Sequence, residues 1–321
     1  MTIGDRIEDV CYDDISLLNH ILPFILFVLT LLLTIPMVVV ILTDNKYHEI
    51  FYLCVLTLLF MNIGMFIANY LTDRIVYIPG ICDYYILHYS NVSFNHNTVF
   101  VILFTYFPIA YAVCVFVISL NRACVIYDPI FAAQKWKDQT RTVLCICVIV
   151  PMIIANVNPP LGSQIVFYPD GIIFYGMDRV FEHPTTFTLM AFANSIFVIF
   201  TIILTSYSVY GIRKKKRQSN NSVEMNLFIV GLGLSAFSIV LTSYLLITVY
   251  LSIIAKDKET AADVSDFRGI FLDFSSLGPS WFIFAVDKKL RRDVMYKLGK
   301  NKPPAYTSSA IFQIRSAIVS K

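Results

Sequence analysis

Few side chains in this chain could do chemistry away from water, and the most unusual is a carboxylate. Asp273 is the only ionisable residue clearly inside one of the chain's long apolar stretches, about four residues below its outer end. An ionisable group in such surroundings is costly and points by default to a binding site. The alternative is that Asp273 bonds a neighbouring helix or stabilises its own helix N-terminus. If Asp273 binds a ligand, we expect Asp273→Asn to alter binding without loss of folding.

Three further residues lie at a comparable depth in other apolar stretches. Tyr106, Asn194 and Tyr244 each lie about seven or eight residues below the outer end of their stretch, which is roughly 10–12 Å of helix. A small ligand at this level could touch several helices, so we predict that these residues line a binding site with Asp273. Packing between helices is their alternative role.

Catalytic chemistry lacks a matching set of residues. A zinc hydrolase needs several histidines at one depth, but the five histidines lie in loops or at stretch edges. An aspartyl protease needs two facing carboxylates, and a Schiff base needs a lysine in the last stretch, which has none. We therefore expect no enzyme, no metal and no cofactor.

The elements that must position these residues are seven apolar stretches, which we call spans. Each approaches the roughly 20 residues that cross a bilayer as a helix. The chain is 57% hydrophobic and 15% charged, against roughly 25% charged in an ordinary soluble domain. We predict an all-α membrane protein, a seven-transmembrane helix bundle. The spans are about 21–42, 50–71, 98–120, 142–160, 187–211, 226–252 and 269–286.

The basic residues give the bundle an orientation. Of the 25 lysines and arginines, 19 follow the first, third, fifth and seventh spans. Such residues collect on the cytosolic side, so we expect an extracellular N-terminal segment, 1–20, a transmembrane domain, 21–286, and a cytosolic tail, 287–321. We interpret the net charge of +3 as a sign of topology in a lipid bilayer and predict no nucleic-acid partner.

Two cysteines and one sequon fall on the predicted outer face. A disulfide between Cys11 and Cys82 would tie the N-terminal segment to the loop that enters the third span, whereas two free thiols are the alternative. Asn91 begins an Asn-Val-Ser sequon and is the expected glycosylation site.

The end of the third span carries a motif. Asn121 and Arg122 are followed by Ala123, Ile126 and Pro129. This run resembles G-protein-coupled receptors of the rhodopsin-like type, whose third helix ends in an acid, an arginine and an aromatic. An aliphatic residue then follows four positions after the arginine, and a proline seven positions after it. Asn121 replaces the acid and Ala123 the aromatic. A guanidinium here could pair with helix six or donate to a partner's carbonyls. The alternative is that Arg122 lies here only because basic residues collect on the cytosolic side of a membrane.

The seventh span gives a second match. The run 278–282, Gly-Pro-Ser-Trp-Phe, lies where such receptors carry an Asn-Pro-x-x-Tyr element, and the resemblance implies that Pro279 and Phe282 form a conformational switch. The following run, 287–298, has basic and apolar residues at helical spacing. It predicts a short amphipathic helix along the inner membrane surface.

These departures are similar to those of the nematode serpentine chemoreceptors. Within that group the chain most resembles the superfamily that contains class gamma and class V receptors. The resemblance implies a plasma-membrane receptor for sensory transduction, in chemosensory neurons and their sensory cilia. It would bind an external small molecule and activate a heterotrimeric G protein through Asn121, Arg122, Ile126 and Pro129. A transporter or channel for a small solute is the alternative, but it would typically show paired repeats and broken helices.

Overall fold

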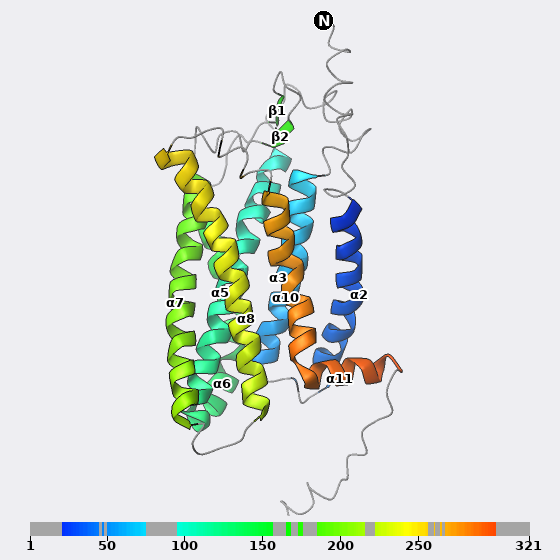
Figure 1. Ribbon diagram of the computed structural model, residues 1–321, viewed down its shortest axis with the longest axis vertical. Coiled ribbons are helices and arrows are strands. Elements are labelled where there is room, and N and C mark those ends of the chain that lie inside the picture. The colour runs from blue at the N-terminus through cyan, green and yellow to red at the C-terminus, as the bar shows by residue number, and fades with distance from the viewer. Residues whose placement is uncertain are drawn as a thin grey trace, which may run out of the picture.

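The computed structural model is a bundle of long helices that run up and down side by side (Figure 1). It describes residues 21–44, 47, 50–74, 95–156, 165–167, 173–175, 185–215, 222–255, 260, 264 and 267–299. Within these described ranges, seven helices are long and apolar enough to cross a membrane. The predicted seven-helix bundle is confirmed.

The seven spans are helices whose residues satisfy their own backbone hydrogen bonds, as a lipid environment requires. A π-helical segment, η4 (Tyr250–Ala255), continues the sixth of them. The bundle helices are α2 (Ile21–Thr43), α3 (Ile50–Asp73), α5 (Asn95–Tyr127), α6 (Pro129–Asn156), α7 (Thr185–Lys215), α8 (Ser222–Val249) and α10 (Arg268–Val286).

Two short elements complete the described chain. The predicted helix after the last span is present as α11 (Lys288–Lys297) and lies across one end of the bundle (Figure 1). An antiparallel pair of strands, β1 (Ile165–Phe167) and β2 (Ile173–Tyr175), stands at the opposite end, with Val166 paired to Phe174. We call the end with β1 and β2 the outer end and the end with α11 the inner end, following the predicted orientation.

The third and fourth helices are longer at their inner ends than the spans predicted from hydropathy. The prediction ended the third span at 120 and began the fourth at 142, but α5 continues to Tyr127 and α6 begins at Pro129. Polar residues after the apolar run still form helix until proline, which has no backbone N–H and disfavours helix in the residue before it. Arg122 therefore lies within a helix.

The bundle has a central helix and a lipid-facing rim. α5 packs against α3, α6, α7 and α8, whereas α10 packs against α8, α3 and α2. Residues such as Ile109, Tyr111 and Ile118 of α5 are fully buried. In contrast, α2, α6 and α7 expose many large apolar side chains, as expected for helices whose outer faces meet lipid tails.

Two tyrosines near the start of α3 hold the inner-end helix α11. Asp287 caps α11 by accepting hydrogen bonds from the backbone N–H groups of Lys289 and Leu290. The hydroxyl of Tyr52 donates to Asp287 Oδ2 at 3.1 Å, and that of Tyr47 donates to Asp293 Oδ2 at 2.5 Å. Burial and the Asp293 carboxylate raise the pKa of Tyr47, which keeps its phenol a donor.

We expect Tyr52→Phe to lower the free energy of unfolding by about 1.5–3 kcal/mol, because it removes a buried hydrogen bond to a charged acceptor. Tyr296→Phe is the matched control, since Tyr296 is 45% exposed on α11. Its effect should stay within about 0.5 kcal/mol. Thermal unfolding of the purified full chain measures both, and equal effects would show that the Tyr52 bond does not hold α11.

Candidate functional site

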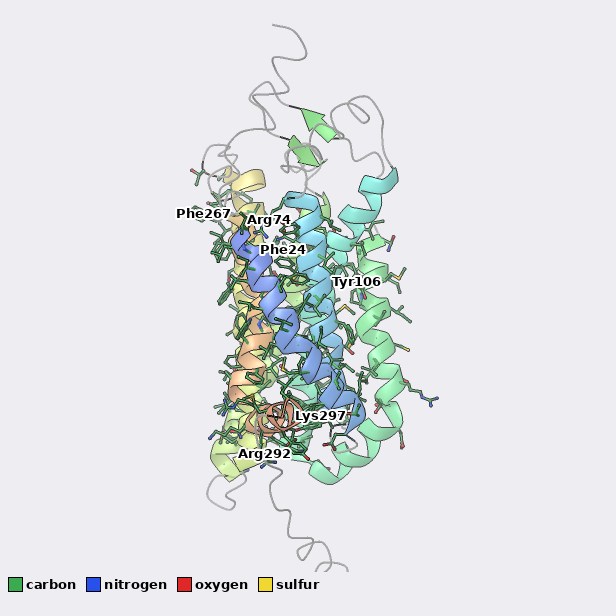
Figure 2. The ribbon with its side chains drawn as sticks, turned by 90° about the vertical axis from the view of Figure 1, so that its right-hand side faces the viewer. Phe24, Arg74, Tyr106, Phe267, Arg292 and Lys297 are labelled. Carbon is green, nitrogen blue, oxygen red and sulfur yellow. The ribbon has the colours of Figure 1, made fainter. Side chains whose placement is uncertain are left out.

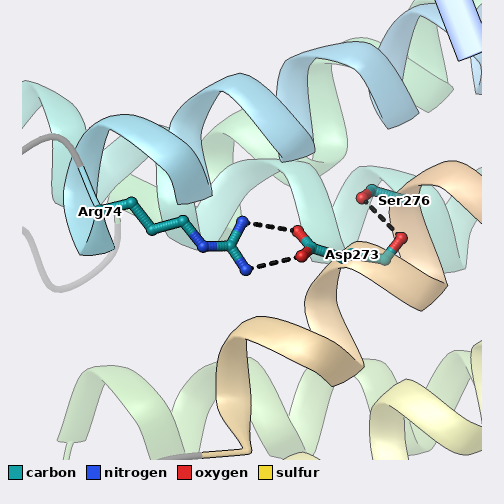
Figure 3. A network of polar contacts seen from close by, with 3 residues as sticks. All are labelled: Arg74, Asp273 and Ser276. Atoms are coloured by element: carbon teal, nitrogen blue, oxygen red, sulfur yellow. Dashed lines mark hydrogen bonds and ion pairs between the residues drawn. The ribbon is translucent and has the colours of Figure 1, made fainter. Parts of the chain in front are cut away.

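The most unusual feature of the outer end is a buried ion pair between two helices. Arg74, the residue after α3, donates two parallel hydrogen bonds to Asp273 of α10, from Nη1 to Oδ1 at 2.9 Å and from Nη2 to Oδ2 at 2.6 Å (Figure 3). The two side chains are 7% and 13% exposed. This planar two-bond geometry is the strong form of the arginine–carboxylate interaction.

A glycine of α10 leaves room for the guanidinium where this helix approaches the end of α3. Gly269 lies one turn before Asp273, and a Cβ there would fall 2.7 Å from Arg74 Nη2. The ring of Tyr70 lies on the arginine's own helix, with its centre 5.9 Å from Arg74 Cζ. Ser276 donates to the backbone carbonyl of Asp273 at 3.2 Å (Figure 3). The guanidinium thus occupies a niche formed by a carboxylate, an aromatic ring and the backbone of α10.

The four predicted ligand residues lie at one level. Measured from the outer ends of their membrane-spanning segments, Tyr106, Asn194, Tyr244 and Asp273 are four to six residues deep, about 6–9 Å along a helix. Figure 2 shows Tyr106 and Arg74 toward the same end of the bundle, opposite Arg292 and Lys297. For the first three residues this depth is somewhat shallower than the seven or eight residues predicted from the sequence.

The described contacts of these residues reach different neighbours. Asn194 donates from its side-chain nitrogen to the Met190 carbonyl at 2.8 Å, while its buried Oδ1 has no hydrogen-bond partner among the described residues. Tyr244 stacks on Phe271 of α10, with ring centres 5.0 Å apart. The half-buried ring of Tyr106 meets Phe107 edge-on at 5.1 Å. Of these residues, Tyr244 and Asp273 are linked by α10, because this helix carries both Asp273 and Phe271.

At the inner end, Arg122 lies inside the bundle. Its side chain is buried, and Nη2 donates to Asn121 Oδ1 at 2.8 Å. Its guanidinium carbon lies 4.2 Å from the centre of the Phe51 ring, at the start of α3. The cation thus contacts an amide oxygen, from the residue that stands at the position of the acid in the rhodopsin-like pattern, and an aromatic face.

The sixth spanning helix, α8, closes over Arg122. A Cβ at Gly231 of α8 would lie 3.9 Å from Arg122 Cγ, so the arginine's stem runs along this helix. One turn farther along α8, the Leu234 carbonyl accepts a hydrogen bond from the Tyr111 hydroxyl at 3.2 Å. α5 and α8 are therefore packed together from the middle of α5, at Tyr111, to Arg122 nearer its inner end.

The remaining residues of the motif lie beside α7. A Cβ at Gly211 would fall 2.8 Å from Ile126 Cγ2, so α5 and α7 meet closely at this buried isoleucine. The neighbouring Tyr127 stacks on Tyr207 with ring centres 3.9 Å apart. Pro129 is the first residue of α6, where its missing N–H carries no penalty.

The predicted switch in the seventh span forms an interlock with α8. Phe282 fits against Gly233, where a Cβ would lie 2.0 Å from the ring, and Phe237 of α8 fits against Gly278 in the same way at 2.5 Å. Pro279 lies between Gly278 and Phe282, inside α10. Any rotation of α8 or α10 must separate these two ring-and-glycine contacts.

Two predictions, the disulfide between Cys11 and Cys82 and the glycosylation of Asn91, fall on residues that the structure does not describe. Among the described residues, Cys54, Cys114 and Cys147 are buried free thiols. The described part of the chain shows no group of three or more histidine, cysteine or acidic residues that could hold a metal ion.

Sequence reasoning missed Arg74 and Phe51. Arg74 follows a span and was counted as an outer-loop charge, but a lone intramembrane carboxylate calls for a partner. The sequence offered more than one cation near an outer span end, Arg268 as well as Arg74, and did not distinguish between them. Phe51 gives no such signal, because one more aromatic residue in an apolar span cannot be distinguished from a packing residue.

The chain matches the model of a known protein family. The family model described as Srg family chemoreceptor matches residues 21–294. That range covers every spanning helix and most of α11. The search of curated proteins gave no match.

Proposed function

The chain belongs to the Srg family of chemoreceptors, and on that premise we propose that it is a G-protein-coupled receptor for an external small molecule. It is a multi-pass plasma-membrane protein, and its family indicates a receptor rather than an enzyme. We further propose that it binds an external small molecule, couples to a heterotrimeric G protein and has its N-terminus outside the cell. The excess of basic residues on the inner side, 19 of 25, supports an extracellular N-terminus.

The observation that carries the proposal is the enclosure of Arg122. A cation held by Asn121 and Phe51 beneath α8 is a group that one conformation buries and another could present. Outward movement of α8 would open the inner end around Arg122, Ile126 and the adjoining ends of α5 and α6. The exposed guanidinium could then donate to backbone carbonyls of a G protein. Buried in the closed bundle, it cannot reach a partner.

The ligand would act by preferring the open form. It can shift such an equilibrium only by its difference in affinity for the two states. We place its site at the level of Asp273, Tyr106, Asn194 and Tyr244. Asn194 Oδ1 is buried and has no hydrogen-bond partner among the described residues, which supports this placement, because such acceptors are uncommon in native structures. Tyr244 contacts α10 at Phe271, and the same helix contacts Phe237 of α8 through Phe274 and Phe282.

The test is expression of the full chain with a G-protein reporter, screened with volatile and water-soluble small molecules. We expect a concentration-dependent response that disappears in cells lacking the reporter's Gα subunit. Cells without the chain are the control. A response that persists without Gα would contradict the proposal. Chain-dependent uptake of a solute without any reporter signal would instead favour the transporter.

A further inference from the structure

We propose that the niche holding the Arg74 guanidinium is the recognition site for a positively charged group of the external ligand. The ligand's ammonium or guanidinium would take the place of Arg74 on Asp273, and Arg74 would turn outward to water. This inference rests on the proposed function, because it names the chemical class of the cue. It requires a site that is built for a cation and a resident cation that can leave.

The niche is built for a planar or compact cation. Asp273 offers both carboxylate oxygens to one guanidinium, at 2.9 and 2.6 Å. The Tyr70 ring adds a second source of attraction for positive charge. Gly269 leaves the space that any side chain would fill, since a Cβ there would lie 2.7 Å from Arg74 Nη2. These three features would serve a ligand cation as they serve Arg74.

The two partners of the ion pair differ in their freedom to move. Arg74 follows the last residue of α3, Asp73, and carries its charge on a long, flexible stem. A few rotations of that stem would bring the guanidinium to the water beyond the outer end. Asp273 belongs to the second turn of α10, and its short side chain, 13% exposed, is held close to that helix. The arginine is therefore the partner that can leave, and the carboxylate is the one that stays.

Charge balance then decides the sign of the ligand. A cation that replaces Arg74 keeps Asp273 paired while Arg74 becomes hydrated. An anion that took Arg74 would leave the fixed carboxylate of Asp273 inside the bundle without the positive charge of the arginine, which is strongly unfavourable. Exchange of one cation for another is the route that leaves no buried charge alone.

The binding half of the proposal can be tested without a G protein. Arg74→Ala removes the atoms that ethylguanidinium carries, so this small cation should enter the niche of the purified full-length variant. At about tenfold excess over its dissociation constant we expect the thermal midpoint to rise by about 2–4 °C. Potassium chloride at equal ionic strength and sodium propionate are the controls. If Arg74→Ala does not fold, Arg74→Gln takes its place.

The carboxylate provides the decisive comparison. In Arg74→Ala/Asp273→Asn, and in the wild-type chain with its tethered guanidinium, the ethylguanidinium shift should be absent. A shift of equal size in the double variant, or no shift in Arg74→Ala, would show that the pair is structural only and would overturn the proposal.

The ligand class is tested with the reporter, using compounds of one carbon skeleton that end in an ammonium, a guanidinium, a hydroxyl or a carboxylate. We expect the active compounds to be cations. Arg74→Gln should lower their half-maximal concentration by roughly tenfold or more, because a tethered competitor acts at an effective concentration of order millimolar. Asp273→Asn should abolish their effect, with surface expression measured for each variant.

An anionic or neutral cue whose response survives Asp273→Asn and is lost in Arg122→Ala would leave the receptor function standing and overturn the cationic ligand. Lower potency of cations in Arg74→Gln would overturn it as well. Loss of the G-protein response alone, with the ethylguanidinium shift intact, would count against the proposed function and not against the cation niche.

Discussion

Arg122→Ala is expected to abolish the reporter response to any active compound while the chain still reaches the cell surface. The guanidinium is the group that the inner end encloses between Asn121, Phe51 and α8. Its loss removes the donor that a G protein would meet when the bundle opens. The variant leaves Asn121 without this contact, which costs about 1–3 kcal/mol of stability. Surface labelling of the intact chain checks that this loss is tolerated.

Arg122→Lys separates a recognition role from a purely topological one. Lysine keeps the positive charge that the orientation rule needs, but it lacks the planar fork of arginine. We expect a loss of roughly tenfold or more in response, since one hydrogen bond of a charged group is worth about 1.5–3 kcal/mol. Arg292→Ala is the matched control, because that inner-end arginine is 47% exposed. Normal signalling by Arg122→Lys would contradict the assigned role.

Arg74→Ala is expected to destabilise the chain more than Asp273→Asn does. Removing the arginine leaves a fixed carboxylate without its partner inside the bundle, and breaking a buried pair in this way costs about 3–5 kcal/mol. Removing the carboxylate's charge leaves a guanidinium that can turn to water. The free energy of unfolding should then fall only by the contribution of the hydrogen bonds between these charged groups, about 1.5–3 kcal/mol. The ion pair thereby revises the expectation from sequence that Asp273→Asn leaves folding untouched.

Thermal unfolding of purified variants measures this order. Arg74→Ala/Asp273→Asn leaves no full charge behind, so it should be no less stable than Arg74→Ala alone, and the two changes should not add. Arg292→Ala, which removes an exposed arginine, should change the free energy of unfolding by at most about 0.5 kcal/mol. An Asp273→Asn variant less stable than Arg74→Ala would show that Arg74 is not the mobile partner.

The sequence by itself determined the class of architecture. The seven spans follow from hydropathy because a helix in lipid satisfies its backbone hydrogen bonds locally, so each span can be recognised without knowing its neighbours. The amphipathic run that became α11 was equally local. The spacing of Arg122, Ile126 and Pro129, together with the helix count, indicated a resemblance to G-protein-coupled receptors. The departures at Asn121 and in the seventh span then indicated the resemblance to nematode serpentine chemoreceptors, and the family model shows the Srg family.

Only the tertiary structure decided which side chains meet. Arg74 and Asp273 are 199 positions apart, and Tyr52 and Asp287 are 235 positions apart. Their pairing depends on how each helix is rotated and shifted against the next. Hydropathy does not encode that rotation, because lipid tails are as apolar as the core and a membrane helix is apolar on both faces. For the same reason the contacts of Phe282 with Gly233 and of Arg122 with Phe51 became visible only once the helices were packed.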